Sequence, residues 1–244
     1  MIEGNGYIRF SNLLNEDVFN VFTNKSFDFN YHTKSKEELD KQYNELEDLI
    51  NYNFKYIKKG KQSHSTNVKV VTEDNLYDEL ENVDGLITNL KGIALVTFVA
   101  DCEAILLYDK KNKVIGNIHS GWKGTLNRII KNAINMMIDS FNTDPKDLIV
   151  SISPSIQKCC FEVDEDVYLN FKKKYNNIDS FTLKKEKKYY IDLIGLNKNS
   201  LKELGVKEDN IYCSNICTKC NSNKYHSYRA NKECGRNLAL ICLK

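Results

Sequence analysis

The segment from Ile93 to Arg128 limits the possible folds of this chain most strongly. Its apolar runs cover residues 93–100, 104–108 and 114–118. Short apolar runs without polar alternation are typical of central strands that are buried on both faces. Between the runs lie the pair Asp101-Cys102 and a polar turn, and the last run leads into His119. The segment therefore predicts strands with a cysteine and a histidine at their ends, where α/β proteins often carry functional residues.

Patterns in the rest of the chain predict an α/β fold. Apolar residues at helical spacing predict helices over residues 35–50, 125–141, 164–175 and 194–204. Further strands are predicted at residues 5–12, 17–23, 68–71, 86–88, 148–152, 180–183, 189–192, 211–214 and 237–243. Ser35 is the expected N-cap of the first helix, and Gly205 is the expected C′ residue of the last. Because no repeat or linker interrupts these patterns, residues 1–244 are expected to form a single domain with a mixed β-sheet flanked by helices.

The composition argues against several classes of function. Lys and Arg number 35 against 33 Asp and Glu, a net charge of +2, and most basic residues are spread along the chain. No nucleic-acid partner is therefore expected. No apolar run approaches the length of a membrane span, and the N-terminus carries no export signal, so a cytoplasmic protein without a membrane partner is expected. The eight cysteines are then expected to be reduced thiols.

Three residues are candidate metal ligands: His64, Cys102 and His119. Two imidazoles and a thiolate suit a catalytic zinc site, which leaves one position open for water or substrate. The three residues lie far apart in the sequence, so a sheet must bring them together. Asp101 is expected to orient an imidazole and to contact substrate. Gln62 is expected to share a strand face with His64 and to contact substrate. The alternative is an inert core cysteine with hydrogen-bonded structural histidines.

The segment SGWKG at residues 120–124 is a candidate anion site. Its two glycines allow a close backbone approach, and a helix expected to begin near Thr125 would offer free N–H groups to a phosphate. Lys123 and Arg229 are the candidate cationic contacts. In the alternative interpretation the glycines only form a tight turn, and Arg229 forms a salt bridge.

The other cysteines are alternative candidate ligands for a metal ion. Cys213, Cys217 and Cys220 with His226 would form a structural zinc knuckle, since C-x-x-C is half of a known zinc motif. The pair Cys159-Cys160 is expected to be unsuited to joint ligation or to a disulfide, because the two residues are adjacent.

Several motifs resemble those of the laccase-domain proteins. QSHSTNV (62–68) resembles their Q-V-H-G-x-x-V segment, DGLITN (84–89) their D-A/G-L-V-T-N, TFVADCEAILLYD (97–109) their T-A-D-C-x-P-V-L-L-Y-D, and GNIHSGWKGTLNRI (116–129) their A-H-A-G-W-R-G. ISPSIQKCCFEVDEDV (152–167), CTKCNSNKYHSYR (217–229) and CGRNLALI (234–241) resemble later segments of the family in the same order. The resemblance covers about residues 60 to 244.

This resemblance implies a single α/β domain in which His64, Cys102 and His119 bind a catalytic zinc ion, with copper as the other candidate metal. The family, once labelled multicopper polyphenol oxidases, is now regarded as purine nucleoside phosphorylases. Its implied substrates are adenosine, inosine and S-methyl-5'-thioadenosine, together with phosphate, and it also deaminates adenosine. The chain is expected to be a monomer or homodimer. The alternative is an amidase that removes misincorporated serine from UDP-MurNAc peptidoglycan precursors, as assigned to some bacterial members.

The chain departs from the family pattern in places. Ser65 stands where the family has Gly, Lys123 where it has Arg, and Glu103 near a usual Leu. The N-terminal T-R-x-G-G-V-S segment is reduced to FTNKSFDFN (22–30), with Lys25 at the position of the Arg.

The chain is not expected to be a true laccase, because its four histidines form no H-x-H pair of the kind that a multicopper cluster requires. Two further hypotheses stay open. One is a metal-free hydrolase with Cys102 as nucleophile and His119 as base. The other is a metal-binding or partner-binding module without catalysis.

Overall fold

A computed structural model describes all of residues 1–244 and contains two six-stranded sheets and one three-stranded sheet. In spatial order, the first sheet consists of β1 (Ile2–Glu3), β2 (Tyr7–Arg9), β3 (Val18–Thr23), β15 (Asn237–Leu243), β7 (Ile93–Val99) and β4 (Tyr56–Lys59). The second consists of β14 (Ile211–Cys213), β10 (Leu148–Ile152), β8 (Glu103–Asp109), β9 (Val114–Ser120), β6 (Gly85–Thr88) and β5 (Val68–Val70). The small sheet has the order β11 (Glu162–Val163), β13 (Lys188–Ile191) and β12 (Thr182–Lys185).

Both large sheets are mixed, which confirms the predicted α/β class. β4 pairs in parallel with β7, and β5 with β6. β7 is antiparallel to its other neighbour, β15, and β8 is antiparallel to both β9 and β10. The sequence predicted one mixed sheet, and that count is wrong. The chain leaves the first sheet at the end of β7 and enters the second with β8, through a corner at Asp101 with φ of 84°. Apolar runs predict strands but do not say which strands pair.

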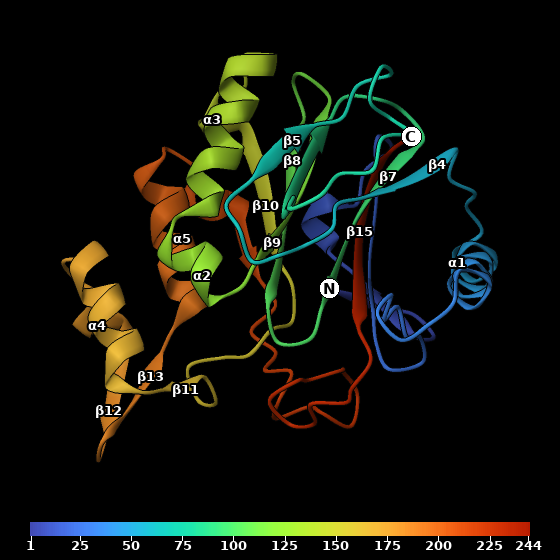
Figure 1. The fold of residues 1–244 in the computed structure, drawn as a ribbon. Helices are drawn as coiled ribbons and strands as arrows, with labels where there is room; N and C mark the ends of the chain where they lie inside the picture. Colours follow the sequence, from blue (N-terminus) through green and yellow to red (C-terminus); the bar gives the residue numbers. More distant parts are fainter.

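Helices cover the outer faces of the two large sheets, and one further helix packs against the small sheet (Figure 1). They are α1 (Lys36–Ile50), α2 (Trp122–Leu126), α3 (Ile129–Phe141), α4 (Glu165–Lys174) and α5 (Leu193–Glu203). Short 3₁₀ helices lie at Ser11–Leu13, Pro145–Asp147, Ile178–Phe181 and Glu208–Asn210. α1 packs on the first sheet, and α3 and α5 pack on the second. The inner faces of the two sheets share one apolar cluster, which includes Leu95, Val99, Leu106 and Ile115. Strands β7, β8, β9 and β15 are therefore buried along their whole length.

The predicted helix boundaries hold at the caps and fail in one place. Ser35 and Glu38 form a capping box at the start of α1, and Gly205 has a φ of 96° after α5, as expected for a C′ residue. The single helix predicted at residues 125–141 is instead two, because Arg128 adopts the left-handed conformation between α2 and α3. The strand predicted at 180–183 begins at Thr182, after a 3₁₀ turn.

A buried asparagine connects the two sheets near the candidate ligands. Asn117 of β9 donates from Nδ2 to the carbonyl oxygens of Leu95 and Ala239 in the first sheet, both at 2.9 Å. Its Oδ1 accepts a hydrogen bond from Thr97 Oγ1 at 2.8 Å. Since His119 follows two residues later on the same strand, these bonds fix its position relative to β7. No helix of the structure combines the length and the apolarity that are needed to cross a bilayer.

Candidate active site

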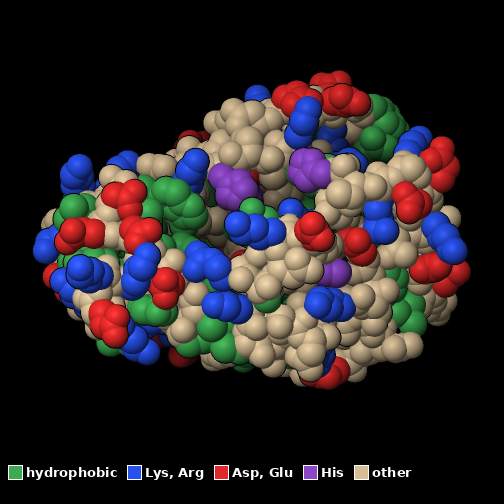
Figure 2. Space-filling view, turned by 60° about the horizontal axis from the view of Figure 1, so that its bottom comes forward, with side chains coloured by type: hydrophobic (Ala, Val, Ile, Leu, Met, Phe, Trp, Pro, Cys, Tyr) green, Lys and Arg blue, Asp and Glu red, His purple; other side chains and the backbone are tan.

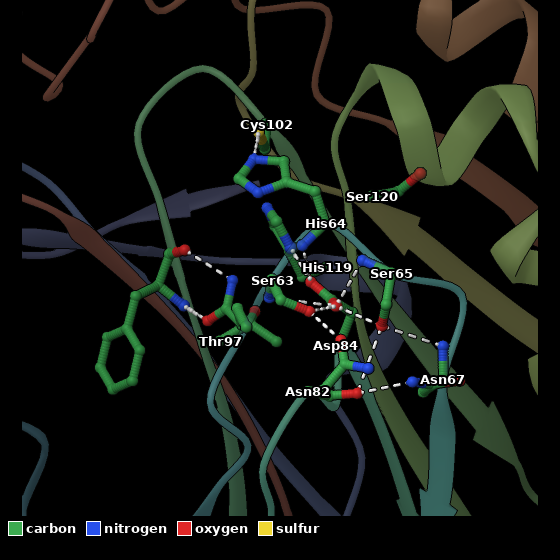
Figure 3. A network of polar contacts seen from close by, with 12 residues as sticks. Ser63, His64, Ser65, Asn67, Asn82, Asp84, Thr97, Cys102, His119 and Ser120 are labelled. Carbon is green, nitrogen blue, oxygen red and sulfur yellow. Dashed lines mark hydrogen bonds and ion pairs between the residues drawn. The ribbon is translucent and has the colours of Figure 1, made fainter.

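The structure brings together the three residues that the sequence singled out (Figure 3). His119 lies at the end of β9, Cys102 in the corner between β7 and β8, and His64 in the loop before β5. Their ligand atoms all lie within 4.8 Å of one another, and Cys102 Sγ is 3.7 Å from His64 Nε2. The rings of His64 and His119 are nearly perpendicular, with centroids 4.8 Å apart.

A buried carboxylate, Asp84, organises this group. Its oxygens accept hydrogen bonds from His119 Nδ1 at 2.7 Å, His64 N at 3.0 Å and Ser65 Oγ at 2.6 Å. They also accept the backbone N–H groups of Ser63 and Ser65. These bonds hold the loop in which His64 has a φ of 60°. Burial, the largest effect, raises the pKa of Asp84, but the hydrogen bonds from His119 and Ser65 keep it well below its ordinary range.

Asp84, and not Asp101, orients an imidazole, so the role predicted for Asp101 is wrong. The Asp101 carboxylate accepts instead from Thr218 Oγ1 and from the backbone N–H of Arg229, both at 2.6 Å. Asp101 therefore ties the Cys102 corner to the C-terminal loop that carries Arg229. Asp84 opens the DGLITN motif, which was the only sequence signal for it. Ser65, which replaces a family Gly, contributes a hydroxyl to Asp84.

Without a metal, Cys102 and His119 favour an ion pair. Burial raises the pKa of Cys102, but the charge of His119 and hydrogen bonds from both histidines outweigh it and bring the pKa to about 6. For His119, burial lowers the pKa, whereas the Cys102 thiolate and Asp84 raise it to about 9. At neutral pH the metal-free site thus holds a thiolate beside an imidazolium. The thiolate is the form that binds a metal, and it is also the form that acts as a nucleophile.

The residues present fit a metal ion. Because the Asp84 carboxylate occupies His119 Nδ1 as a hydrogen-bond acceptor, Nε2 is the nitrogen available for ligation. Gly121 leaves the space that the ligands need, since a Cβ at this residue would lie 2.7 Å from His64 Cδ2 and 3.0 Å from Cys102 Sγ. Imidazole and thiolate donors suit zinc, and they also suit copper.

The three residues line a cavity of about 480 Å³. Its aromatic walls are formed by Tyr31, Phe98, Trp122, Phe161 and Tyr228. Its other polar side chains are His32, Gln62, Asp101, Arg229 and Arg236. In the space-filling view, histidine and basic side chains surround a hollow on this face (Figure 2). An aromatic cavity with a few convergent polar groups is typical of a site for a small molecule.

Two of the predicted substrate contacts, Gln62 and Lys123, differ from the prediction in their position in the fold. Gln62 lines the cavity but is not on a strand; its side-chain amide forms two hydrogen bonds with the backbone of Phe98, at 2.8 and 3.0 Å. Lys123 is exposed on α2, with Nζ 5.7 Å from the Trp122 ring, and does not line the cavity. α2 begins at Trp122 and has only five residues, so the predicted helix start near Thr125 is wrong.

Two arginines of the cavity, rather than a helix start, are the candidate contacts for an anion. Arg229 lines the cavity, and its Nη1 donates to the carbonyl oxygen of Glu162 at 2.9 Å, so it does not form the salt bridge considered as the alternative. Arg236, which the sequence reasoning missed, donates from Nη1 to the carbonyl oxygens of Cys234 and Gly235. Its only signal was its place in CGRNLALI. Tyr31 and His32 carried no signal.

The remaining cysteines are arranged differently from the prediction. Cys159 and Cys160 gather with Cys217 and Cys220. The expectation that the adjacent pair is unsuited to joint ligation is therefore contradicted by its position. The predicted knuckle is also wrong in its membership, because neither Cys213 nor His226 belongs to this group. His226 Nε2 lies 2.9 Å from the carbonyl oxygen of Phe27 instead.

Comparisons with known proteins found relatives that are similar over two thirds of the chain or more. A purine nucleoside phosphorylase from Borreliella burgdorferi is 31% identical over 234 residues, which cover 93% of this chain and 92% of that protein. Adenosine deaminase RL5, from an unknown prokaryotic organism, is 33% identical over 178 residues, or 69% of this chain and 68% of that protein.

Solved structures share the fold. The crystal structure of YlmD from Geobacillus stearothermophilus has a TM-score of 0.89 at 22% sequence identity, over 100% of this chain and 98% of that one. At this identity the likeness concerns the fold alone. The family model described as multi-copper polyphenol oxidoreductase laccase matches residues 19–244. The match includes strands of both large sheets and every residue of the His64, Cys102 and His119 group, and the chain belongs to this laccase-like family.

Proposed function

We propose that the protein is a zinc-dependent purine nucleoside phosphorylase that acts on adenosine, inosine and S-methyl-5'-thioadenosine and also deaminates adenosine. The observation that carries the proposal is the meeting of His64, Cys102 and His119 in an aromatic cavity that also contains Arg229 and Arg236. The names of two relatives support it: the purine nucleoside phosphorylase of Borreliella burgdorferi and adenosine deaminase RL5.

The cavity offers chemically distinct surfaces for a purine base and for phosphate. Aromatic rings such as those of Phe161 and Tyr228 bind a purine by stacking. Guanidinium groups match the geometry of phosphate oxygens, so Arg229 and Arg236 are the proposed phosphate contacts. In phosphorolysis a phosphate oxygen bonds to C1′ of the ribose while the bond from C1′ to the purine nitrogen breaks. The base leaves with that electron pair and takes up a proton. Asp101 contributes by holding the backbone of Arg229.

His64, Cys102 and His119 are the residues that would hold the metal, and a zinc ion bound there supplies Lewis acidity. The chain's own part is to orient His119 and to keep Cys102 deprotonated. Asp84 holds the proton of His119 on Nδ1, and the low pKa of Cys102 keeps its sulfur as thiolate. The aromatic walls exclude bulk water from the reacting atoms.

The test is incubation of the purified protein with inosine, adenosine or S-methyl-5'-thioadenosine, with and without phosphate. We expect phosphate-dependent release of the free base and ribose 1-phosphate, and inosine from adenosine. Cys102→Ala should abolish both reactions, whereas Cys213→Ala, outside the cavity, should keep them. Metal analysis of the same samples should show bound zinc in wild type and one equivalent less in Cys102→Ala.

Other outcomes assign other functions. Activity that survives exhaustive chelation would favour the metal-free Cys102 nucleophile. Release of serine from a serine-containing UDP-MurNAc precursor, without nucleoside turnover, would favour the amidase. No turnover of any of these substrates by the metal-loaded protein would contradict an enzymatic role.

A further inference from the structure

We propose that Cys159, Cys160, Cys217 and Cys220 form a second, structural metal site that binds a thiophilic divalent ion such as Zn²⁺. This four-cysteine site, as we call it below, is separate from the His64, Cys102 and His119 group and goes beyond the proposed function. The structure assigns it from four thiols that come from two distant parts of the chain, and each side chain offers one sulfur to a common centre.

The distances between the sulfur atoms match a tetrahedral site. Sγ of Cys160 lies 3.4 Å from Sγ of Cys220, and Sγ of Cys159 lies 3.6 Å from that of Cys160 and 3.7 Å from that of Cys220. All four sulfurs, Cys217 included, lie within 4.8 Å of one another. A tetrahedron with Zn–S bonds of about 2.3 Å has edges of about 3.8 Å. Small shifts of the side chains are therefore enough to enclose a metal.

The backbone around the four-cysteine site is organised as in thiolate sites. Residues 157–160 form a turn in which Cys160 N donates to the carbonyl oxygen of Gln157 at 2.9 Å. Residues 217–221 form another, closed by Asn221 N and the carbonyl oxygen of Cys217 at 3.0 Å. The backbone N–H groups of Gln157 and Cys220 both hydrogen-bond to Cys217 Sγ. Such N–H groups stabilise the negative charge that a metal-binding sulfur carries.

Ligand chemistry favours a metal over disulfides. The group consists of four sulfurs, and an all-thiolate set is the closed coordination typical of structural zinc. Metal binding releases protons from the thiols and needs no oxidant. Two disulfides would need an electron acceptor and S–S contacts of about 2.05 Å, and the adjacent pair is poorly placed for them. Cys159 and Cys220 are exposed, so a metal ion can reach the site from solvent.

A metal ion bound at the four-cysteine site would hold together the two turns that lead to one wall of the cavity. The two turns are already joined by hydrogen bonds between Thr218 N and the carbonyl oxygen of Ser155 at 3.0 Å, and between Ser155 N and that of Ile216 at 3.2 Å. The first turn leads into Phe161, a cavity residue. Arg229, which follows the second, donates from Nη1 to the carbonyl oxygen of Cys160 at 3.5 Å. The four-cysteine site therefore positions cavity residues and does not itself contact substrate.

The test uses cobalt as a spectroscopic probe of the full-length protein, stripped of metal and kept reduced. Thiolate-to-cobalt charge transfer in the near ultraviolet grows with the number of sulfur ligands. Wild type should bind cobalt at both sites with strong charge transfer. His64→Ala/His119→Ala should lose one site and keep most of that band. Cys217→Ser/Cys220→Ser should also lose one site, and with it most of the band.

Controls separate a lost site from a lost fold. Cys213→Ser is the matched cysteine control and should bind cobalt as wild type does. Circular dichroism checks the double variants, and the exposed Cys159→Ser, which leaves the buried Cys217 in place, should weaken cobalt binding without unfolding. The proposal is overturned if Cys217→Ser/Cys220→Ser keeps the full charge-transfer band. Mass analysis that finds a Cys160–Cys220 disulfide in protein isolated from metal-replete cells would also overturn it. Since these readouts do not involve nucleosides, failure here leaves the proposed phosphorylase untouched.

Discussion

The His64, Cys102 and His119 group and the four-cysteine site are held in place by different means. The first rests on strand ends and on the buried carboxylate of Asp84, and it offers three donors. The second rests on two surface turns and backbone N–H groups, and it offers four. Three protein ligands leave a position for substrate, whereas four close the coordination shell. The contrast indicates that the first group performs chemistry and that the second supports the fold.

The largest difference between the two groups should appear on removal of one sulfur from each. Cys102→Ala should abolish nucleoside turnover and leave the thermal stability of the metal-free protein nearly unchanged, because Cys102 is only partly buried. Cys220→Ser should lower the thermal midpoint of the zinc-loaded protein and keep a measurable turnover. Steady-state assays and thermal melts of both variants check this. Equal loss of activity in the two would break the comparison.

A second prediction concerns pH and the buried Glu103 beside Cys102. Desolvation by burial, together with the charges of Asp192 and Cys102, outweighs the hydrogen bond from Asn197 and raises the pKa of Glu103 from 4.5 to about 8. Between these pH values the folded state holds a proton that the unfolded state has lost. The free energy of unfolding should therefore fall as the pH rises through this window, by about 3 to 5 kcal/mol in total.

Glu103→Gln should remove this fall in the free energy of unfolding in the metal-free protein. Denaturant unfolding at pH 5 and pH 9 should show a gain over wild type at pH 9 and little at pH 5. Cys220→Ser, a substitution at an exposed thiol, should keep the pH slope of wild type. A Glu103→Gln slope equal to that of wild type would show that this carboxyl group ionises normally.

Third, Asp84→Asn should weaken metal binding at the first group about 10- to 100-fold, because it removes the carboxylate that orients His119. Cobalt binding at the four-cysteine site should not change, because Asp84 holds only the His64, Cys102 and His119 group. Asp109→Asn is the matched control: Asp109 is equally buried but accepts hydrogen bonds from the turn at Lys111 and Asn112. Equal metal affinity in Asp84→Asn and wild type would refute the role of Asp84.

Fourth, Gly121→Ala should displace the ligands by crowding. Its Cβ would meet His64 Cδ2 and Cys102 Sγ, at a cost of about 1 to 3 kcal/mol in metal binding or stability. Gly124→Ala, whose Cβ would have its nearest contact at 3.3 Å, is the control and should be tolerated. Isothermal titration with zinc measures both, and a Gly121→Ala protein that binds like wild type would contradict the packing argument.

The smallest effect is expected at Lys123, which the sequence marked as a substrate contact. Since Lys123 is exposed and does not line the cavity, Lys123→Ala should change KM for phosphate less than about twofold, as is usual for surface substitutions. Arg229→Ala, its counterpart in the cavity, should raise that KM clearly. A large effect at Lys123 would restore the anion site first predicted at residues 120–124.

Local signals were sufficient for much of the fold. Apolar runs predicted β7, β8 and β9, because strands covered on both faces need apolar side chains throughout. Capping residues such as Ser35 and Gly205 marked helix ends, because a few neighbouring atoms decide that geometry. The break at Arg128 escaped prediction, since the apolar spacing continues through it.

What the sequence by itself determined is the set of chemical groups and the strands and helices that carry them, including His64, Cys102 and His119. Only the tertiary structure decided how many sheets those strands form, that Asp84 rather than Asp101 serves His119, and that Cys159 and Cys160 meet Cys217 and Cys220. The physical reason is the range of the interactions. Periodicity records burial along one element, whereas these contacts join residues far apart in the chain and depend on how sheets and loops pack together.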